Sequence, residues 1–487
     1  MPNSPEEEYE LLPTTEVYTG VDNDGHIPRF KRRSQKLSFV YRHPKAVLFT
    51  SIAFFIGALI FMSYDILYLK AKLAITGSYN AFLHNLWPVG LPNRTDMWEN
   101  ENSKSMQALL SCMSTDTCTQ NQTSIVLLSS MHFANSISGH VSGEDIWASS
   151  VLDALRDMGY TCIFTNTNEE LARTYRQYPD LVKIVILEGS ASHECFKSEK
   201  CIKKPTHPLG IPAWKMFSFH FWGGAENPLG NAWTLSPENY GLISPGNSKD
   251  NIYLGYSIER QCMQIPVTPM HERPRQAYIL AKQSRYFYGN DYAWPNMTYD
   301  DPPFDVNIVA GIAMNNSEPG QVLPSGIVDY GRLTKEEFYA HLGKSRVLVG
   351  IGKPTLSPSP YDALCMGLSF INPIMSWAKD DPENRTRWQS QHDALKFLDP
   401  PYVYNVRKGH VEAFWSALGQ ALDAQIDRYI VPQMTMEALK YRVARLVEGN
   451  WKEKAIKLLE ERKATGKGEY VIVLFYLWIE MDIIQTT

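Results

Sequence analysis

The sequence lacks the signatures of several common enzyme classes. Its only Asp-x-Asp triplet, Asp22-Asn23-Asp24, lies near the N-terminus, so the rest of the chain has no such carboxylate pair to hold a divalent ion on a diphosphate. The twelve histidines show no zinc-ligand spacing, and no Gly-x-Ser-x-Gly nucleophile elbow occurs. These absences argue against hydrolases and metalloenzymes, and we expect neither a cofactor nor a metal.

An excess of charge of either sign is also missing. Lys and Arg number 47 and Asp and Glu 52, which gives a net charge of −5 over 487 residues. This balance gives no electrostatic reason to expect nucleic acid as a partner. No internal repeat is apparent, which argues against a solenoid. The length and the 44% hydrophobic content are typical of a globular chain with more than one domain.

One uncharged apolar run, AVLFTSIAFFIGALIFMSY, occupies residues 46–64. About 20 such residues cross a bilayer as a single helix. A buried core helix would usually have a polar face, and a cleaved signal peptide would lie nearer the N-terminus. Basic residues cluster before the run, among them Lys31, Arg32, Arg33, Lys36, Arg42 and Lys45. The positive-inside rule then predicts a cytosolic tail at 1–45, an anchor at 46–64 and translocation of the remainder, which is type II topology.

The remainder of the chain has features that agree with translocation. All seven cysteines follow the apolar run. Cys112/Cys118 and Cys195/Cys201 are each close enough to close a small loop, although spacing does not decide pairing. At least one thiol stays unpaired, and the three remaining candidates are Cys162, Cys262 and Cys365. N-glycosylation sequons also follow the run, with acceptors Asn93, Asn121, Asn296, Asn315 and Asn384.

Strand and helix patterns alternate in two separate stretches. The first shows a βαβαβ pattern from Ser124 to Gly189, and the second runs from Gln276 to Gln425. Such alternation predicts a parallel sheet in each stretch. A segment rich in Trp, Gly and Pro separates them. We therefore predict an α/β protein with a lumenal stem at 65–123, Rossmann-like domains at 124–265 and 266–467 facing a cleft, and an atypical apolar C-terminus at 468–487.

Three interpretations of the C-terminal segment stay open. GEYVIVLFYLWIEMDIIQTT follows a polar helix as an abrupt apolar run. It is a terminal strand, a membrane-associated segment, or the result of a gene-model error in which a splice donor was read through.

The segment VGIGKPTLSPSPYDALCMGLSFINP, residues 349–373, has the pattern of strand, Gly/Pro loop, helix and strand. Ligands of parallel sheets bind at the carboxyl ends of strands. Gly350 and Gly352 end such a strand, where glycine lets the backbone approach a ligand. The helix that follows offers free N–H groups to phosphate. Asp362 can accept hydrogen bonds from ribose hydroxyls, or it only stabilises its own helix. A nucleotide is the predicted ligand.

The motif SGHVSGEDIW places Glu144 after a Gly-containing loop at the start of a helix. A carboxylate that faces the cleft at this position can act as a general base. The alternative is an ordinary glutamate of a helix's first turn, and Asp145 beside it could be mistaken for the base. The residues alone leave both alternatives open.

Several segments together resemble glycosyltransferase family 18. GRLTKEEFYAHLGKSRVLVGIGKPTLSPSPYDALCMGLSFINP resembles, without a gap, the family's segment from a Gly-Ile-Leu-Ser turn through a Val-Gly-Leu-Gly-Phe-Pro loop to a Phe-Leu-Asn-Pro end. SQH follows it. LSPENYGLISPGNSKDNIYLGYSIER and VPQMTMEALKYRVARLVE resemble further family segments. SGHVSGEDIWASSVLDALRDMGY resembles a Ser-Gly-Gly-Pro-Leu-Gly-Glu loop and its helix. The resemblance extends patchily from Ser124 to Glu461.

The resemblance implies a GT-B fold and an inverting, metal-independent transfer of GlcNAc from UDP-GlcNAc. The implied acceptor is the 6-hydroxyl of an α1,6-linked mannose on an N-glycan, and the implied location is the Golgi membrane with a lumenal catalytic domain. The family's catalytic base falls on Glu144. Implied donor-binding residues are Gly350, Gly352, Pro354, Ser359 and Asp362. Further substrate contacts are expected at Lys353, Ser390, Gln391 and His392.

Three positions depart from the family pattern. The helix carboxylate is Glu in the family and Asp362 here, a second loop Glu falls on Leu356, and Lys353 stands where the family has Phe. Leu356 cannot hydrogen-bond a sugar. Two alternatives therefore stay open: a GT-B glycosyltransferase with another sugar nucleotide or glycan acceptor, and a catalytically inactive glycan-binding membrane protein.

Overall fold

The computed structural model describes residues 97–466 apart from 247–249, 296 and 314–321, and near the N-terminus 52–60, 62, 63, 66 and 67. The chain divides into two compact units, Met1–Ile75 and Thr76–Thr487. The predicted tail, part of the predicted anchor and the predicted apolar C-terminus lie outside the described residues. The same holds for three of the sequons, at Asn93, Asn296 and Asn315. Among the described residues, no helix is both long and apolar enough to span a membrane.

The first sheet has six parallel strands in the order β2-β1-β3-β4-β5-β6. The strands are β1 (Ile125–Ser129), β2 (Thr161–Phe164), β3 (Val182–Glu188), β4 (Met216–Phe219), β5 (Thr234–Ser236) and β6 (Ile252–Tyr253). All of β1 is buried, as expected for a parallel strand covered on both faces. The patterns predict β1 to β3 but miss β4 to β6, because these short strands lie in the segment rich in Trp, Gly and Pro, where strands and helices show no regular alternation.

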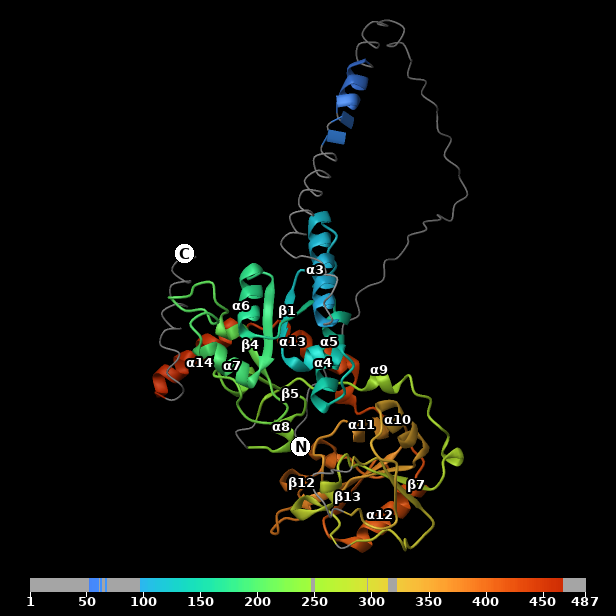
Figure 1. Cartoon of the computed structure of the whole chain (residues 1–487). Helices are drawn as coiled ribbons and strands as arrows, with labels where there is room; N and C mark the ends of the chain where they lie inside the picture. Colours follow the sequence, from blue (N-terminus) through green and yellow to red (C-terminus); the bar gives the residue numbers. More distant parts are fainter. Residues whose placement is uncertain are drawn as a thin grey trace, which may run out of the picture. The chain divides into compact units, whose positions relative to one another are not determined.

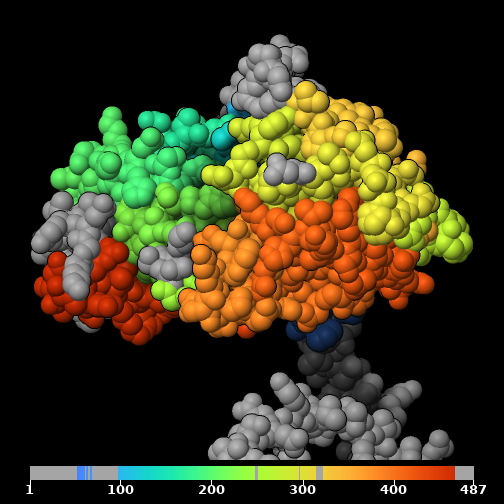
Figure 2. Space-filling view, turned by 90° about the horizontal axis from the view of Figure 1, so that it is seen from below, coloured from blue at the N-terminus to red at the C-terminus, as the bar shows by residue number. Residues whose placement is uncertain are grey.

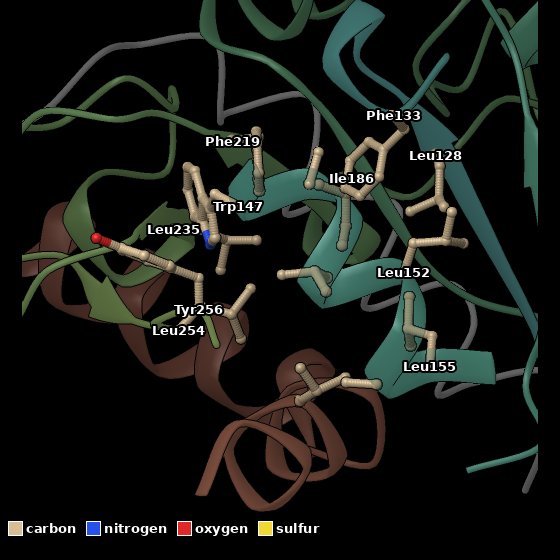
Figure 3. Close-up of a cluster of buried hydrophobic side chains, with 14 of the residues drawn as sticks. Leu128, Phe133, Trp147, Leu152, Leu155, Ile186, Phe219, Leu235, Leu254 and Tyr256 are labelled. Carbon is tan, nitrogen blue, oxygen red and sulfur yellow. The ribbon is translucent and has the colours of Figure 1, made fainter. Parts of the chain in front are cut away.

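Helix α5 (Gly143–Asp157) forms much of the core beside this sheet. Its apolar residues recur at helical spacing and are buried against the strands. Figure 3 shows Trp147 of α5 beside Phe219 at the end of β4, and their ring centroids are 3.4 Å apart. Further helices of this domain are α4 (Met131–Ile137), α6 (Asn168–Gln177) and α7 (Gly189–Lys197).

The second sheet follows the order β12-β11-β10-β7-β8-β9, with β13 beside β11. Its pairs are parallel except for the antiparallel pair of β11 and β12. The strands are β7 (Gln276–Ile279), β8 (Asn307–Ala310), β9 (Ile327–Asp329), β10 (Val347–Val349), β11 (Ser369–Ser376), β12 (Gln389–Ser390) and β13 (Val403–Arg407). The helices are α10 (Lys335–Lys344), α11 (Ser359–Cys365) and α12 (Val411–Asp423). Two parallel sheets confirm the predicted α/β fold with two Rossmann-like domains.

Part of the predicted stem, residues 97–115, forms a helix with buried residues. Helix α3 (Met97–Thr115) belongs to the first domain, and its buried residues include Met106 and Leu109. β2 is the edge strand of the sheet, and Asn102 takes the place of a neighbouring strand beside it. Its side chain donates to Phe164 O and accepts from Phe164 N, both at 2.7 Å. The sequence of this helix is mostly polar, so it gives no sign that a narrow stripe of its residues, including Asn102, is buried.

The helices at the C-terminal end of the predicted second domain reach the first domain. The sequence from Thr435 to Lys463 has the pattern of one long helix, but Asn450 caps a new helix and divides it into α13 (Met436–Val447) and α14 (Trp451–Thr465). Trp451 packs edge-on against Phe217 and Trp233 of the first domain, at 4.8 and 5.8 Å. Figure 2 shows red α14 beside the green surface of the first domain, and Figure 1 shows α14 well apart from α10 and α12 of the second.

Three disulfides are present. Cys112–Cys118 and Cys195–Cys201 confirm the two short loops suggested by spacing. Cys262–Cys365 joins the end of the first domain to α11 of the second. Among the described cysteines, Cys162 stays free, and it is buried.

Candidate active site

A cavity of about 520 Å³ lies between the two domains. The first domain contributes the start of α5 to its wall, through Val141, Gly143 and Ile146. The second contributes the segments after β7, β8 and β9 and the first turns of α10 and α11. Its lining residues there include Lys282, Gln283, Gly311, Arg332, Lys335, Tyr339, Ser359 and Asp362. The predicted cleft therefore exists, at the carboxyl ends of parallel strands, where ligands of such sheets bind.

A capping box fixes the first turn of α5, which carries Glu144. Asp145 N donates to Ser142 Oγ at 3.0 Å, and Ser142 N donates to Asp145 Oδ2 at 2.9 Å. A methyl group added at Gly143 would lie 3.6 Å from Pro358 of the second domain. Pro358 belongs to the segment 350–358 between β10 and α11, named here the donor loop, so the start of α5 meets this loop. Glu144 is half-buried, and its side chain makes no hydrogen bond or ion pair with any described residue. Among the described residues, its neighbours Gly143 and Ile146 line the cavity, whereas Glu144 itself does not, and its role as the base stays a prediction.

Asp362 is a buried carboxyl group in the cavity wall, 4% exposed. Tyr339 donates a hydrogen bond to its Oδ1 at 3.3 Å. Burial raises the pKa of Asp362 to about 7, while the charge of Lys335 and the Tyr339 hydrogen bond act in the opposite direction. This carboxyl group is suited to accept hydrogen bonds from the hydroxyls of a ligand. Ser359 opens the same helix, α11, and also lines the cavity.

The donor loop contains Gly350, Gly352 and Pro354. None of these three residues is among the described residues that line the cavity. Gly352 has φ +106°, and a Cβ there would lie 2.0 Å from Asp291 O. Gln391 ties the loop together, because it accepts from Gly352 N at 2.8 Å and donates to Pro354 O at 3.0 Å. Because these glycines have no side chain, another segment of the chain can pack against the loop. Their direct contact with a donor stays a prediction.

The side chains of Ser390 and Lys353 have partners within the protein, whereas both ring nitrogens of His392 are buried without a hydrogen-bond partner among the described residues. Both N and Oγ of Ser390 donate to Asp393 Oδ1. His392 is fully buried with its ring edge-on to a tyrosine at 4.8 Å, and burial lowers its pKa to about 3, which keeps it neutral. Lys353 Nζ lies 3.8 Å from a carboxylate oxygen of Asp291. Among the described residues none of these three lines the cavity, and their substrate contacts stay predictions.

The sequence patterns missed the cations of the cavity wall. Lys282 follows β7, Arg332 follows β9, and Lys335 begins α10. The side chains of Lys282 and Arg332 form no hydrogen bond or ion pair with other described residues, whereas Lys335 Nζ donates to Gln261 Oε1 at 2.7 Å. The available signal was a basic residue directly after each of two predicted strands. Unpaired cations beside helix N-termini favour a phosphate-bearing ligand.

Two of the predicted glycosylation asparagines are described. Asn121 Nδ2 donates to Met158 O at 2.9 Å, and Asn384 Oδ1 accepts from Thr386 Oγ1 at 2.6 Å. Both are half-buried. Modification of either stays a prediction.

Two Rossmann-like domains around a cleft lined by free cations and a buried carboxyl group have the arrangement of a glycosyltransferase of the GT-B type. The comparison with protein families gives the particular family. Glycosyltransferase family 18 matches residues 131–454, more than half of the chain, and the chain belongs to this family.

The curated relatives share one printed activity. The chain is 25% identical over 235 residues to alpha-1,6-mannosylglycoprotein 6-beta-N-acetylglucosaminyltransferase A of Cricetulus griseus and of Homo sapiens, which covers 46% of this chain and 30% of theirs. It is 23% identical over 227 residues to the human form B, covering 43% and 27%. The chain thus matches less than a third of the length of these relatives.

Solved structures with a similar arrangement are more distant. T4 phage BGT in complex with its UDP-glucose substrate has a TM-score of 0.32 and 9% identity, and covers 70% of this chain and 99% of its own. The glycosyltransferase SnogD from Streptomyces nogalater has a TM-score of 0.28 and 12% identity, and covers 69% and 98%.

Proposed function

We propose that this protein is an inverting glycosyltransferase that moves GlcNAc from UDP-GlcNAc to the 6-hydroxyl of an α1,6-linked mannose on N-glycans. Family membership and the activity of the relatives support the choice of donor and acceptor. The observation that carries the proposal is the cleft, whose wall includes the start of α5 on one side and Asp362 with free cations on the other.

The donor would bind to the second domain. Lys282 and Arg332 would pair with the diphosphate, and the N-terminal N–H groups of α10 would add to its stabilisation. Asp362 would accept hydrogen bonds from the ribose. The same cations stabilise the negative charge that develops on the leaving UDP, which is the usual role of preorganised donors in group transfer.

Glu144 would act as the general base. Its carboxylate takes the proton from the acceptor hydroxyl while that oxygen bonds to the anomeric carbon. The bond from the anomeric carbon to the diphosphate oxygen breaks at the same time, and UDP leaves from the opposite face, so the configuration inverts. A base of this kind contributes about 10²- to 10⁴-fold to the rate.

Glu144→Gln tests this assignment. The variant should lose at least about a hundredfold in transfer, because glutamine cannot accept the proton. UDP affinity, measured by titration calorimetry, should stay unchanged. The matched control is Glu169→Gln, which changes an exposed glutamate in the first turn of α6 on the same sheet. Wild-type turnover by Glu144→Gln would overturn the role of Glu144.

Leu356 favours a second candidate, a GT-B enzyme with a different donor or acceptor. The residue is buried, has a positive φ of 52°, and offers no hydrogen bond to a sugar. A panel of sugar nucleotides and N-glycan acceptors, assayed in EDTA, separates the candidates. Transfer from UDP-GlcNAc supports the first, transfer from another donor the second, and the absence of nucleotide binding indicates an inactive glycan-binding protein.

We further propose that residues 46–64 anchor the protein in the Golgi membrane with its catalytic part in the lumen. The apolar run, the basic residues before it and the sequons beyond it support this topology. Mass spectrometry of the protein from cells should find a glycan that a glycosidase removes on Asn121 or Asn384. Unmodified sequons, together with cleavage of the catalytic part by protease added to intact vesicles, would contradict this topology.

A further inference from the structure

Tyr339 joins two helices in the wall of the cavity between the domains. It lies on α10, and its hydroxyl donates a hydrogen bond to Oδ1 of Asp362 on α11 at 3.3 Å. Figure 1 shows the two helices side by side. Both residues line the cavity. A ligand that fills the cavity would therefore meet this contact directly.

Helix α10 fixes the position of the Tyr339 ring. A capping box holds its first turn, in which Glu337 N donates to Thr334 Oγ1 at 3.2 Å and Thr334 N donates to Glu337 Oε2 at 2.8 Å. The centroid of the Tyr339 ring lies 5.6 Å from that of Phe338 and 5.8 Å from Nζ of Lys335. These contacts restrict the ring, so its hydroxyl has a defined place in the cavity wall.

The Asp362 carboxyl group keeps one oxygen for a ligand. Oδ1 accepts from Tyr339, whereas Oδ2 has no hydrogen bond with any described residue. Oδ2 is also not among the described polar atoms that are fully buried without a partner, so it can be reached from the cavity that Asp362 lines. A carboxylate offers about four lone-pair sites on its two oxygens. Oδ2 can therefore accept from a ligand while Oδ1 stays bound to Tyr339.

The neighbours of Asp362 favour its ionised form. Burial raises the pKa of Asp362, and the charge of Lys335 and the hydrogen bond from Tyr339 oppose this rise. Lys335 is itself held in place, because its Nζ donates to Gln261 Oε1 at 2.7 Å. An ionised carboxylate only accepts hydrogen bonds, so the matching group on a ligand is a donor such as a sugar hydroxyl.

We propose that Tyr339 is a positioning residue for the donor: its hydroxyl holds Oδ1 of Asp362, so that Oδ2 is directed at the ribose hydroxyls of the nucleotide. The inference rests on the proposed function, in which Asp362 binds the ribose. An aspartate side chain has two rotatable bonds, and a bond to one oxygen fixes the direction of the other. The carboxylate is then ordered before the donor arrives, which reduces the entropy lost on binding.

Tyr339→Phe in the full chain tests the proposal with two nucleotides, UDP and 2′,3′-dideoxy-UDP, which lacks both ribose hydroxyls. The variant should bind UDP about three- to tenfold more weakly, because the ribose hydrogen bonds lose their fixed acceptor. It should bind dideoxy-UDP as wild type does. Titration calorimetry measures both affinities. The KM for UDP-GlcNAc should rise by the same factor, and kcat should stay within about twofold of wild type.

Asp362→Ala shows whether Tyr339 acts through that carboxylate. This variant should lose the preference of wild type for UDP over dideoxy-UDP, and adding Tyr339→Phe to it should change neither affinity further. The matched control is Tyr330→Phe. The Tyr330 ring stacks on His341 of α10, with 4.0 Å between centroids, and its hydroxyl has no hydrogen bond with a described residue. The control should keep both affinities of wild type.

Wild-type affinity for UDP in Tyr339→Phe, or an equal loss for both nucleotides, would overturn the positioning role. The ribose contact of Asp362 would still stand if Asp362→Ala lost the preference for UDP. If Asp362→Ala kept the full preference, the ribose contact in the proposed function would be wrong, and the inference would fall with it. The two failures are thus seen in different variants.

Discussion

Arg332 and Lys282 are cations in the cavity wall with no partner among the described side chains. A surface cation without a partner is common, but two that line the same cleft beside helix N-termini are positioned for an anion. Neither residue forms part of a recognisable motif. Their role depends on β7 and β9 ending at the same side of one sheet.

Arg332→Ala should weaken UDP binding about tenfold or more, because a hydrogen bond to a charged group contributes about 1.5–3 kcal/mol. Uridine affinity should change little, since uridine has no phosphate. Titration calorimetry with both ligands measures the difference. Arg275→Ala is the control, because Arg275 pairs with Asp423 in the same domain. Equal losses for UDP and uridine would show that Arg332 does not bind the diphosphate.

At the scale of the element, the donor loop is held in place by residues that lie far away in the sequence but close in space. Gly352, Gln391 and Asp291 pack so closely that only a residue without a side chain fits at position 352. The pattern of strand, loop and helix was predictable because its signals lie within a few residues of each other. The clamp by Gln391 was not, because it joins positions 39 residues apart.

Gly352→Ala should destabilise the protein by about 2 kcal/mol or more, because a Cβ would lie 2.0 Å from Asp291 O in addition to the strained φ. Denaturant unfolding measures the loss. Gly409→Ala separates the two causes: Gly409 also has a positive φ, +79°, but nothing lies within 4 Å of its Cβ position. That variant should lose only about 1 kcal/mol. Equal losses would mean that the close contact is unimportant.

At the scale of the whole molecule, buried contacts connect the two domains next to the donor helix. Tyr361 of α11 donates to the carboxyl oxygens of Glu238 in the first domain, at 3.2 and 3.3 Å. The Cys262–Cys365 disulfide reaches the same helix from the first domain. Both contacts lie within four residues of Asp362, so the orientation of the domains and the shape of the donor site depend on the same helix.

Glu238→Gln should remove a pH dependence of stability. Burial raises the pKa of Glu238 to about 8, whereas an unfolded glutamate has a pKa of about 4.3. Between these two pKa values residue 238 is ionised in the unfolded chain but protonated in the folded protein. The wild-type free energy of unfolding should therefore fall as pH rises from about 4 to 8. The advantage of Glu238→Gln over wild type should grow through this window and then level off.

Urea unfolding at several pH values measures that advantage. Glu272→Gln, at an exposed position, should follow the wild-type curve throughout. A constant difference between Glu238→Gln and wild type would contradict the raised pKa of the interdomain carboxyl group.

The sequence by itself determined the elements whose signals are local. The βαβαβ pattern from Ser124 to Gly189 and the strand, loop, helix and strand pattern of residues 349–373 depend on signals within a few residues. The elements β1 to β3, β10, α11 and β11 lie where these patterns predict them. The family segments likewise identified a glycosyltransferase. Only the tertiary structure decided that α3 and α14 pack against the first domain and that two cations meet at the cleft. The physical reason is that burial and charge pairing depend on residues far apart in the chain, which no local pattern records.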